Sequence, residues 1–557
     1  MKYTLALRET ASATGFFSPT PSEVLTFEES FSHIRAHPLD SFMHGYLLNR
    51  LIELSIFDFE SMLDIEKHAA VLALLYEAIL LHGAFSHLRH RFDPHDVVTL
   101  AQTSPMPYIR SSQIADQRLH GKWTRLFRAN IQGLMPLPRL ENTGLEPPFP
   151  LSQFSNDEGL ESIFSSSRPD ASPLNHNQTS PEATARRVLE ELERLAVLEG
   201  NESRHVSSLS PIALMQKWRM NISVRSGRNN YRLSGIQTAY GRGLDAWSAR
   251  VGYAMEIVER RSAFADIEEG RVMGTVQPHE LRHGTWESLQ HAGVPALDPN
   301  RLQLEVPYTQ APVYWMKGET PDAEGETPMW LPAQIVYLFS NLDEINIFSG
   351  FGSTGLAAGN TFSRARLGAL LECVERDADA VTPFDPSRCF RIIADDPEVS
   401  VLLQDYRNRG LHVGCQEITT EIGIPVYRCF VVGMDGQAAR GTGAHLNGKR
   451  ALLSALTETP YPYPYGPPSL PITEPFTVKR FESLPNLETG CESRDLSLAE
   501  SLLSAKGYRP IYVDLTRSDL PIPVVRAVIP GLEMVNDFDF LSRVSPRLFA
   551  NYLKMVH

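Results

Sequence analysis

GLDAWSARVGYAMEIVER, which runs from Gly243 to Arg260, recurs later in the chain as GNTFSRARLGALLECVER, from Gly359 to Arg376. The two stretches align without a gap. The aligned positions that carry the same residue are Gly243/Gly359, Ala249/Ala365, Arg250/Arg366, Gly252/Gly368, Glu256/Glu372, Val258/Val374, Glu259/Glu375 and Arg260/Arg376. Chance alone rarely preserves such a set, so the sequence predicts an internal repeat of two related helices, each opened by a glycine-containing turn.

Each predicted helix presents a pair of carboxylates. Glu256 and Glu259 in one stretch, and Glu372 and Glu375 in the other, are three residues apart, which places each pair on one side of its helix. The neighbouring apolar residues, which predict packing of each helix against a core, are Ala254, Met255, Val258, Leu370, Leu371 and Val374. We therefore expect the four glutamates at the edge of a core.

Carboxylates that converge need a compensating partner, because like charges a few ångströms apart repel and raise each other's pKa. Magnesium meets this need, since it prefers oxygen ligands and shares one or two carboxylates with substrate phosphates. The guanidinium groups of Arg260 and Arg376 would bind phosphate oxygens or hold the glutamates in place. A single E-x-x-E-R stretch is more often a solvated helical face with local ion pairs, but its duplication favours a site.

The chain is expected to divide into three regions. Apolar residues recur three and four apart from about Phe27 to Leu134, which predicts an α-helical N-terminal region at residues 1–135. Residues 136–206 are predicted to form a linker with one amphipathic helix, which is capped by Ser180, has a solvated outer face and stops near Gly200. Runs such as GIPVYRCFVV and YRPIYVDLT predict strands between helices, so residues 207–557 should form an α+β domain of mixed helices and strands.

Bulk composition narrows the class of protein. The chain has 557 residues, of which 42% are hydrophobic, and this suits a globular protein. The net charge of -14 argues against binding to nucleic acid or to an anionic membrane. No signal sequence or long apolar span is evident, so we expect a cytoplasmic protein. The five cysteines lack the spacing of a zinc site or a disulfide framework and are predicted to be reduced core residues: Cys373, Cys389, Cys415, Cys429 and Cys491.

At the repeat, the sequence resembles the YcaO family, whose domain carries a duplicated acidic helix preceded by a stretch close to S-N-G-L-A-A-G-N-T. Here that stretch reads STGLAAGNT, from Ser353 to Thr361. Further motifs follow in family order, and they are GTGAHL (Gly441 to Leu446), ALTE (Ala455 to Glu458), YVDLT (Tyr512 to Thr516) and IPVVRAVIPGLE (Ile522 to Glu533). The resemblance covers about Ser207 to Phe540 and implies a YcaO-like fold with an internal pseudo-repeat.

The resemblance implies an enzyme that uses ATP and Mg²⁺ to activate a backbone amide in a ribosomally made peptide, as in bacteriocin maturation. In the commonest reaction, a Cys, Ser or Thr side chain attacks the preceding carbonyl, and the amide oxygen leaves as phosphate when a thiazoline or oxazoline ring forms. Similar enzymes that use external sulfide form a thioamide. The implied partners are a precursor peptide and a leader-binding or sulfur-delivery protein, and homodimer formation stays open.

Residue by residue, the resemblance implies that Glu256, Glu259, Glu372 and Glu375 are catalytic and bind magnesium and phosphate. The residues that it implies for the cofactor are Arg260, Asn360, Arg376, Glu458 and Arg526. The positions that depart from the family pattern are Gly252, Thr354, Arg364 and the Thr459-Pro460 pair, which ends a helix that the family continues. These departures motivate an alternative, a related subunit that binds peptide or a partner without hydrolysing ATP.

Two other motifs invite functional interpretations. HELRH, from His279 to His283, matches the H-E-x-x-H zinc-protease pattern, but Pro278 and Gly284 flank it closely, so we expect a polar surface turn. TPYPYPYGPPSLP, from Thr459 to Pro471, must be a loop or extended arm because repeated proline forbids a helix. This segment either guides substrate or is a rigid surface loop.

Overall fold

A long hairpin of β4 (Ile212–Ser226) and β5 (Asn229–Gly243) forms the middle of the largest sheet. The computed structural model describes residues 1–10, 13–154, 180–322, 325–535 and 537–556. Buried residues alternate with exposed ones along both strands, the period of two expected when one face is covered. The sheet has eight strands in the order β2-β1-β5-β4-β6-β7-β8, with β3 beside β4. Its other strands are β1 (Lys2–Thr10), β2 (Ala13–Pro21), β3 (Leu198–Arg204), β6 (Asp266–Glu268), β7 (Arg271–Met273) and β8 (His279–Glu280).

Two further sheets come from the second half of the chain. One has six strands, in the order β11-β10-β18-β19-β12 with β9 beside β10, and the other has five, in the order β16-β15-β14-β13-β17. The strands are β9 (Arg282–Gly284), β10 (Val313–Asp322), β11 (Gly325–Pro332), β12 (Leu356–Ala358), β13 (Cys389–Ile393), β14 (Gly414–Glu417), β15 (Val426–Val432), β16 (Ala438–Ala444), β17 (Thr477–Arg480), β18 (Ile511–Asp514) and β19 (Val524–Val528). The runs GIPVYRCFVV and YRPIYVDLT contain β15 and β18, as predicted.

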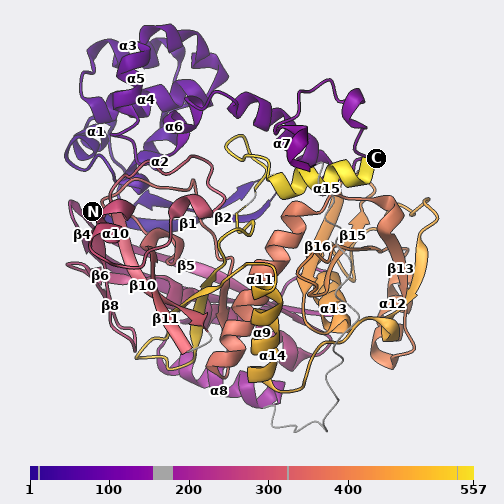
Figure 1. The fold of residues 1–557 in the computed structure, drawn as a ribbon. Coiled ribbons are helices and arrows are strands. Elements are labelled where there is room, and N and C mark those ends of the chain that lie inside the picture. Colours follow the sequence, from indigo (N-terminus) through magenta and orange to yellow (C-terminus); the bar gives the residue numbers. More distant parts are fainter. Residues whose placement is uncertain (11–12, 155–179, 323–324, 536, 557) are drawn as a thin grey trace.

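The two repeat stretches form the long helices α9 (Ala246–Ala263) and α11 (Phe362–Val381), each of which follows a strand. The carboxylate of Asp245 caps α9 by accepting two backbone N–H groups, and the hydroxyl of Thr361 caps α11. Strand β12 packs against both helices, which lie together in the middle of Figure 1. The other helices of this part are α10 (Trp286–His291), α12 (Pro397–Asn408), α13 (Gly448–Glu458) and α14 (Glu492–Ser504). The predicted mixed fold of helices and strands with two related acidic helices is confirmed.

The predicted N-terminal helices begin at Phe27, where the helical pattern was expected to start. The helices are α1 (Phe27–Ala36), α2 (Ser41–Leu51), α3 (Ile56–Ile65), α4 (Ala69–Leu81), α5 (Pro94–Leu100), α6 (Tyr108–Ser112) and α7 (Gln117–Ile131). Before them, within the region assigned to residues 1–135, lie the strands β1 and β2, which the sequence analysis did not predict. Tyr3 and Leu5 are buried while Lys2 and Thr4 are exposed, and this alternation belongs to a strand.

Both ends of the chain pack onto other regions. Strand β1 pairs with β5, and the C-terminal helix α15 (Pro546–Val556) packs on α7 through an aromatic cluster that includes Trp123 and Tyr552 (Figure 1). Helices α1 to α6 gather at the upper left of that view, and buried residues of α1 to α4 belong to the same core as those of β1 and β5. The N-terminal region therefore shares a sheet and a core with the rest of the chain, and the division at residues 135 and 206 stays a prediction.

Helix α8 (Pro181–Arg194) is the amphipathic helix predicted in the linker, and Ser180 caps it as expected. It ends before Gly200, because Ala196 adopts a positive φ of 50° and Gly200 already lies in β3. One face of α8 is buried and packs against α9, so the helix is more than a solvated connector. Most of the preceding polar stretch, residues 155–179, lies outside the described residues.

Four of the five cysteines are buried and free, as predicted. Cys491 is exposed, which corrects its assignment to the core. It occupies the N-cap position of α14, where the chain enters a helix at the surface. Among the described residues, no helix has both the length and the apolar character needed to cross a bilayer.

The proline-rich segment that follows α13 is a loop, as predicted, and the helix ends at Glu458. Tyr461 and Tyr463 are buried in it, and the hydroxyl of Tyr463 donates to Asp405 at 2.6 Å. Tyr465 is 80% exposed. Because two of its three tyrosines pack inward, this segment contributes mainly to the core.

Candidate active site

The glutamates of the repeat lie at a partly buried surface between α9 and α11. Their side-chain exposures are 25% for Glu256, 17% for Glu259, 25% for Glu372 and 11% for Glu375. A solvated helical face would leave them open to water. Glu458, at the end of α13, also lies near α11. Burial raises its pKa, and the charges of Glu375 and Glu372 raise it further. Carboxylates from three helices therefore face one region.

Groups of the strands β5 and β16 hold two of these carboxylates by hydrogen bonds. The amide N–H of Tyr240 in β5 donates to Oε2 of Glu256 at 2.7 Å. The amide N–H of Ala444 and the hydroxyl of Thr442, both in β16, donate to Glu375 at 3.2 and 2.9 Å. The protein itself thus holds one glutamate of each pair in place.

Strand β5 lies close enough to α9 for the contact between Tyr240 and Glu256, because the strand and the helix each carry a glycine where they meet. A Cβ at Gly241 would overlap the carbonyl oxygen of Ala249, and a Cβ at Gly252 would lie 3.0 Å from the Cα of Gly241. The close approach of strand and helix explains why glycine fits at position 252, where the family pattern has serine.

Burial raises the pKa of three of the carboxyl groups. The pKa values of Glu372 and Glu458 rise to about 7, chiefly through burial, and the charge of Glu375 adds to both. The pKa of Glu259 also rises, through burial and through the charge of Glu372. A bound divalent cation would favour the charged forms of these groups.

Three arginines surround the carboxylates without close pairing. The shortest N–O distances from Arg260 and Arg376 to the glutamates of their own helices are 3.5 and 3.7 Å. Arg526 in β19 is buried, and its Nη2 donates to the carbonyl oxygen of Gly352 at 2.8 Å. Its Nε and Nη1 have no hydrogen-bond partner among the described residues. A buried N–H group without an acceptor is unfavourable, so an anionic ligand would be stabilised here.

Helix α8 adds residues that the sequence did not indicate. Nη2 of Arg187 donates to Oδ1 of Asn360 at 2.6 Å, and Nδ2 of Asn360 donates to the hydroxyl of Thr184 at 3.0 Å. The predicted cofactor residue Asn360 is therefore oriented by α8. The i, i+4 spacing of Thr184, Val188 and Leu192, all buried, is the signal that could have identified the inner face of this helix.

The residues present fit magnesium bound to a triphosphate. Among the described residues, no three His, Cys, Asp or Glu side chains form a group that could hold a metal ion unaided. Mg²⁺ commonly takes only one or two carboxylates and completes its coordination with substrate phosphates and water. Carboxyl groups whose pKa is raised are suited to bind the cation. Arginine N–H groups without acceptors are suited to bind the phosphate oxygens. The individual roles of these residues stay predictions.

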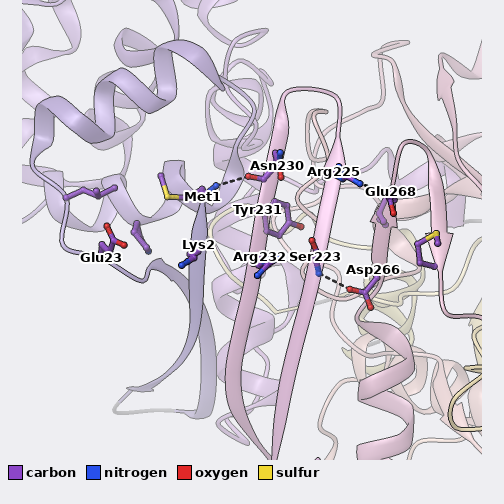
Figure 2. A pocket seen from close by; sticks show the side chains of 14 residues that line it. Met1, Lys2, Glu23, Ser223, Arg225, Asn230, Tyr231, Arg232, Asp266 and Glu268 are labelled. Carbon is purple, nitrogen blue, oxygen red and sulfur yellow. Dashed lines mark hydrogen bonds and ion pairs between the residues drawn. The ribbon is translucent and has the colours of Figure 1, made fainter.

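The large cavity in Figure 2, of about 910 Å³, is a different place. It lies at the sheet surface formed by β1, β4, β5 and β6, and no glutamate of α9, α11 or α13 is among the described residues that line it. Arg225 there pairs with Glu268, and Asp266 accepts the backbone N–H of Ser223 at 2.8 Å. Because this cavity holds none of the repeat's glutamates, cavity size alone does not identify the site.

The HELRH motif does not form a helix. Its first histidine lies in β8 and its second in β9, so they do not share the face of one helical turn. Nε2 of His279 is within 2.7 Å of the carbonyl oxygen of Asp514, and the ring of His283 packs against Tyr314. The expected polar surface turn is also corrected, because four of the five residues of the motif lie in these two short strands.

A protein-family model described as YcaO cyclodehydratase, ATP- and Mg²⁺-binding, matches residues 240–460 and 465–533, slightly more than half of the chain. An uncharacterised protein of Rhizobium leguminosarum bv. trifolii, from the tfuA 3' region, is 26% identical over 346 residues, which are 55% of this chain and 78% of that protein. An uncharacterised protein of Methanothermobacter thermautotrophicus is 26% identical over 330 residues, which are 53% of this chain and 81% of that protein.

Among solved structures, a heterocyclase in complex with substrate and cofactor is similar in fold, with a TM-score of 0.50 and 20% sequence identity. The similar part covers 66% of this chain and 54% of that protein, so this chain matches about half of the heterocyclase. The likeness supports the mixed α and β fold.

Proposed function

Because the chain belongs to the YcaO family of ATP- and Mg²⁺-binding cyclodehydratases, we propose that it activates a backbone amide of a peptide substrate with Mg-ATP. The observation that carries this proposal is the meeting of Glu259, Glu372 and Glu458, from three helices, at one partly buried surface. Most often such activation closes an azoline ring from Cys, Ser or Thr in a ribosomally made peptide. We propose a cytoplasmic location, because the reaction uses ATP.

Each group of residues has a distinct part in this proposal. The glutamates of α9 and α11 hold Mg²⁺, and the N–H groups of Arg526, Arg260 and Arg376 bind phosphate oxygens. An amide oxygen is a poor leaving group, and ATP supplies the phosphoryl group that makes it a good one. The protein then contributes mainly position and charge stabilisation, as in phosphoryl transfer generally.

The test is mass spectrometry of a Cys-, Ser- and Thr-rich peptide encoded near the gene, after incubation with the protein and Mg-ATP. Cyclodehydration removes about 18 Da per ring, whereas thioamide formation with added sulfide adds roughly 16 Da. We expect the loss, together with release of phosphate. Glu372→Gln should abolish the mass change, and Glu190→Gln, an exposed change on α8, should not.

A second candidate is a subunit that binds peptide or a partner protein without using ATP. The observation that favours it is the end of α13 at Glu458, where Pro460 prevents further helix. Peptide binding without any nucleotide binding by the purified chain would establish this alternative. Nucleotide binding that Glu372→Gln abolishes would exclude it.

A further inference from the structure

The open face of the β4–β5 hairpin is basic, although the chain as a whole has a net charge of -14. The two strands contain no Asp or Glu, and their cations are Lys217, Arg219, Arg225, Arg232 and Arg242. The register between the strands is continuous, so the alternation of side chains puts these five on one face. That face is opposite to α9, because the intervening Gly241 lies against the helix.

Some of these cations have acidic partners and others do not. Arg219 pairs with Glu199 of β3, and Arg225 pairs with Glu268 of β6. Lys217 and Arg232 are exposed, and neither forms an ion pair within the described part of the chain. Their charged groups are therefore available to carboxylates of another molecule.

The cavity of about 910 Å³ lies at the turn end of this hairpin (Figure 2). Arg232 lines it from β5, and Lys2 lines it from β1. Two of its three acids, Asp266 and Glu268, are engaged by groups of β4, and Glu23 is the third. The size of the cavity suits a short stretch of a flexible ligand.

The other end of the hairpin reaches the acidic cluster, since the N–H of Tyr240 donates to Glu256. Tyr240 follows Arg232 on β5 after about eight residues, which corresponds to about 26 Å along a strand. The open-face positions between them carry no charge, and they are Ser234, Ile236 and Thr238. An extended peptide of about eight residues spans the same distance.

We propose that the open face of the β4–β5 hairpin binds an acidic segment of the peptide substrate. The segment runs from the cavity at Lys2 and Arg232 along β5 toward the glutamates of α9 and α11. Carboxylate side chains of the peptide pair with Arg232 and Lys217, and an apolar side chain contacts Ile236, which is 51% exposed. This inference rests on the proposed function and names the part of the substrate that is recognised away from the reacting amide.

The first experiment measures binding of labelled peptides to the full chain by fluorescence anisotropy. The probes are a short peptide of alternating Glu and Ser and the same peptide with Gln in place of Glu. The acidic peptide should bind about 10-fold more tightly than the uncharged one, and its affinity should fall as salt is added.

Lys217→Glu/Arg232→Glu should weaken binding of the acidic peptide by about 10-fold, because attraction becomes repulsion, and should leave the uncharged peptide unaffected. The matched control is Lys122→Glu/Arg125→Glu, which reverses one exposed lysine and one exposed arginine on α7. Both variants change the net charge of the protein equally, so a difference between them reports the position of the charges.

A second measurement tests whether the occupant is the substrate. In the mass-spectrometric assay of the proposed function, Lys217→Glu/Arg232→Glu should raise the KM of the peptide by about 10-fold and change kcat less than about twofold. An unchanged KM would assign the surface to a different partner and overturn the inference.

The outcomes separate the inference from the proposed function. If the unaltered protein binds no Mg-ATP, the proposed function fails, and the assignment of a substrate fails with it. If the unaltered protein binds Mg-ATP but does not prefer the acidic peptide, only the inference fails. The same holds if the hairpin variant binds the acidic peptide as well as the control variant does. Weaker binding of the acidic peptide with unchanged affinity for Mg-ATP supports the inference.

Discussion

Replacing Glu372 by glutamine should make the ligand-free protein more stable near pH 8. The pKa of Glu372 is raised from 4.5 to about 7, first of all by burial, so the fold opposes its charge. One pKa unit corresponds to about 1.4 kcal/mol, and the shift therefore amounts to roughly 3 kcal/mol at a pH above 7. Its side chain is 25% exposed, and water screens part of this penalty. We expect a gain of about 1 to 2 kcal/mol, because glutamine keeps the shape and removes the charge.

The gain should depend on pH in a defined direction. Between pH 4.5 and about 7, the folded protein binds more protons at Glu372 than the unfolded chain does, so stability falls as the pH rises through this window. Below this window the carboxyl group is protonated in both states, and the advantage of Glu372→Gln disappears. Urea unfolding of both proteins at about pH 5 and about pH 8 measures the difference, with Glu190→Gln as the control. A variant that is less stable at the higher pH, or a gain that is the same at both, would refute this reasoning.

Two further predictions concern contacts that support the site. Arg187→Ala should weaken binding of Mg-ATP by about 2- to 10-fold, because Asn360 loses one hydrogen bond that orients it. Titration calorimetry measures the affinity, and an unchanged affinity would contradict the prediction. Arg547→Met should lower the free energy of unfolding by about 3 kcal/mol, because it leaves the buried carboxylate of Asp377 without the partner that lies 2.5 Å away. Adding Asp377→Asn should restore most of that loss in urea unfolding, and no restoration would count against a charge effect.

The features that the sequence predicted correctly are those that depend on a local residue pattern. The gap-free match between two stretches predicted α9 and α11, and Asp245 and Thr361 cap them as their side chains favour. The strand runs of the second half and the end of α13 before Pro460 also follow from local chemistry. These features depend on residues close together in the chain.

The features that the sequence did not reveal depend on residues far apart. Strand β1 pairs with β5, which lies more than two hundred residues later in the chain. The alternation of buried and exposed residues in β1 is short, and the sequence analysis gave more weight to the long helical pattern that follows it. The contact of Arg187 with Asn360 and the meeting of Arg242 with Glu458 in one cavity arise only when separate elements fold together. In HELRH the local sequence matches a complete zinc-protease motif, but its backbone is extended and not helical, so the match does not predict a metal site.

The most direct measurement is a titration of the purified protein with ATP, in the presence and in the absence of Mg²⁺, for the unaltered chain and for Glu259→Gln/Glu372→Gln. The account predicts binding that requires Mg²⁺ and that weakens by at least about 100-fold in the double variant, since two charged ligands are lost. Equal affinity with and without Mg²⁺, or a double variant that binds Mg-ATP as well as the unaltered protein, would contradict it.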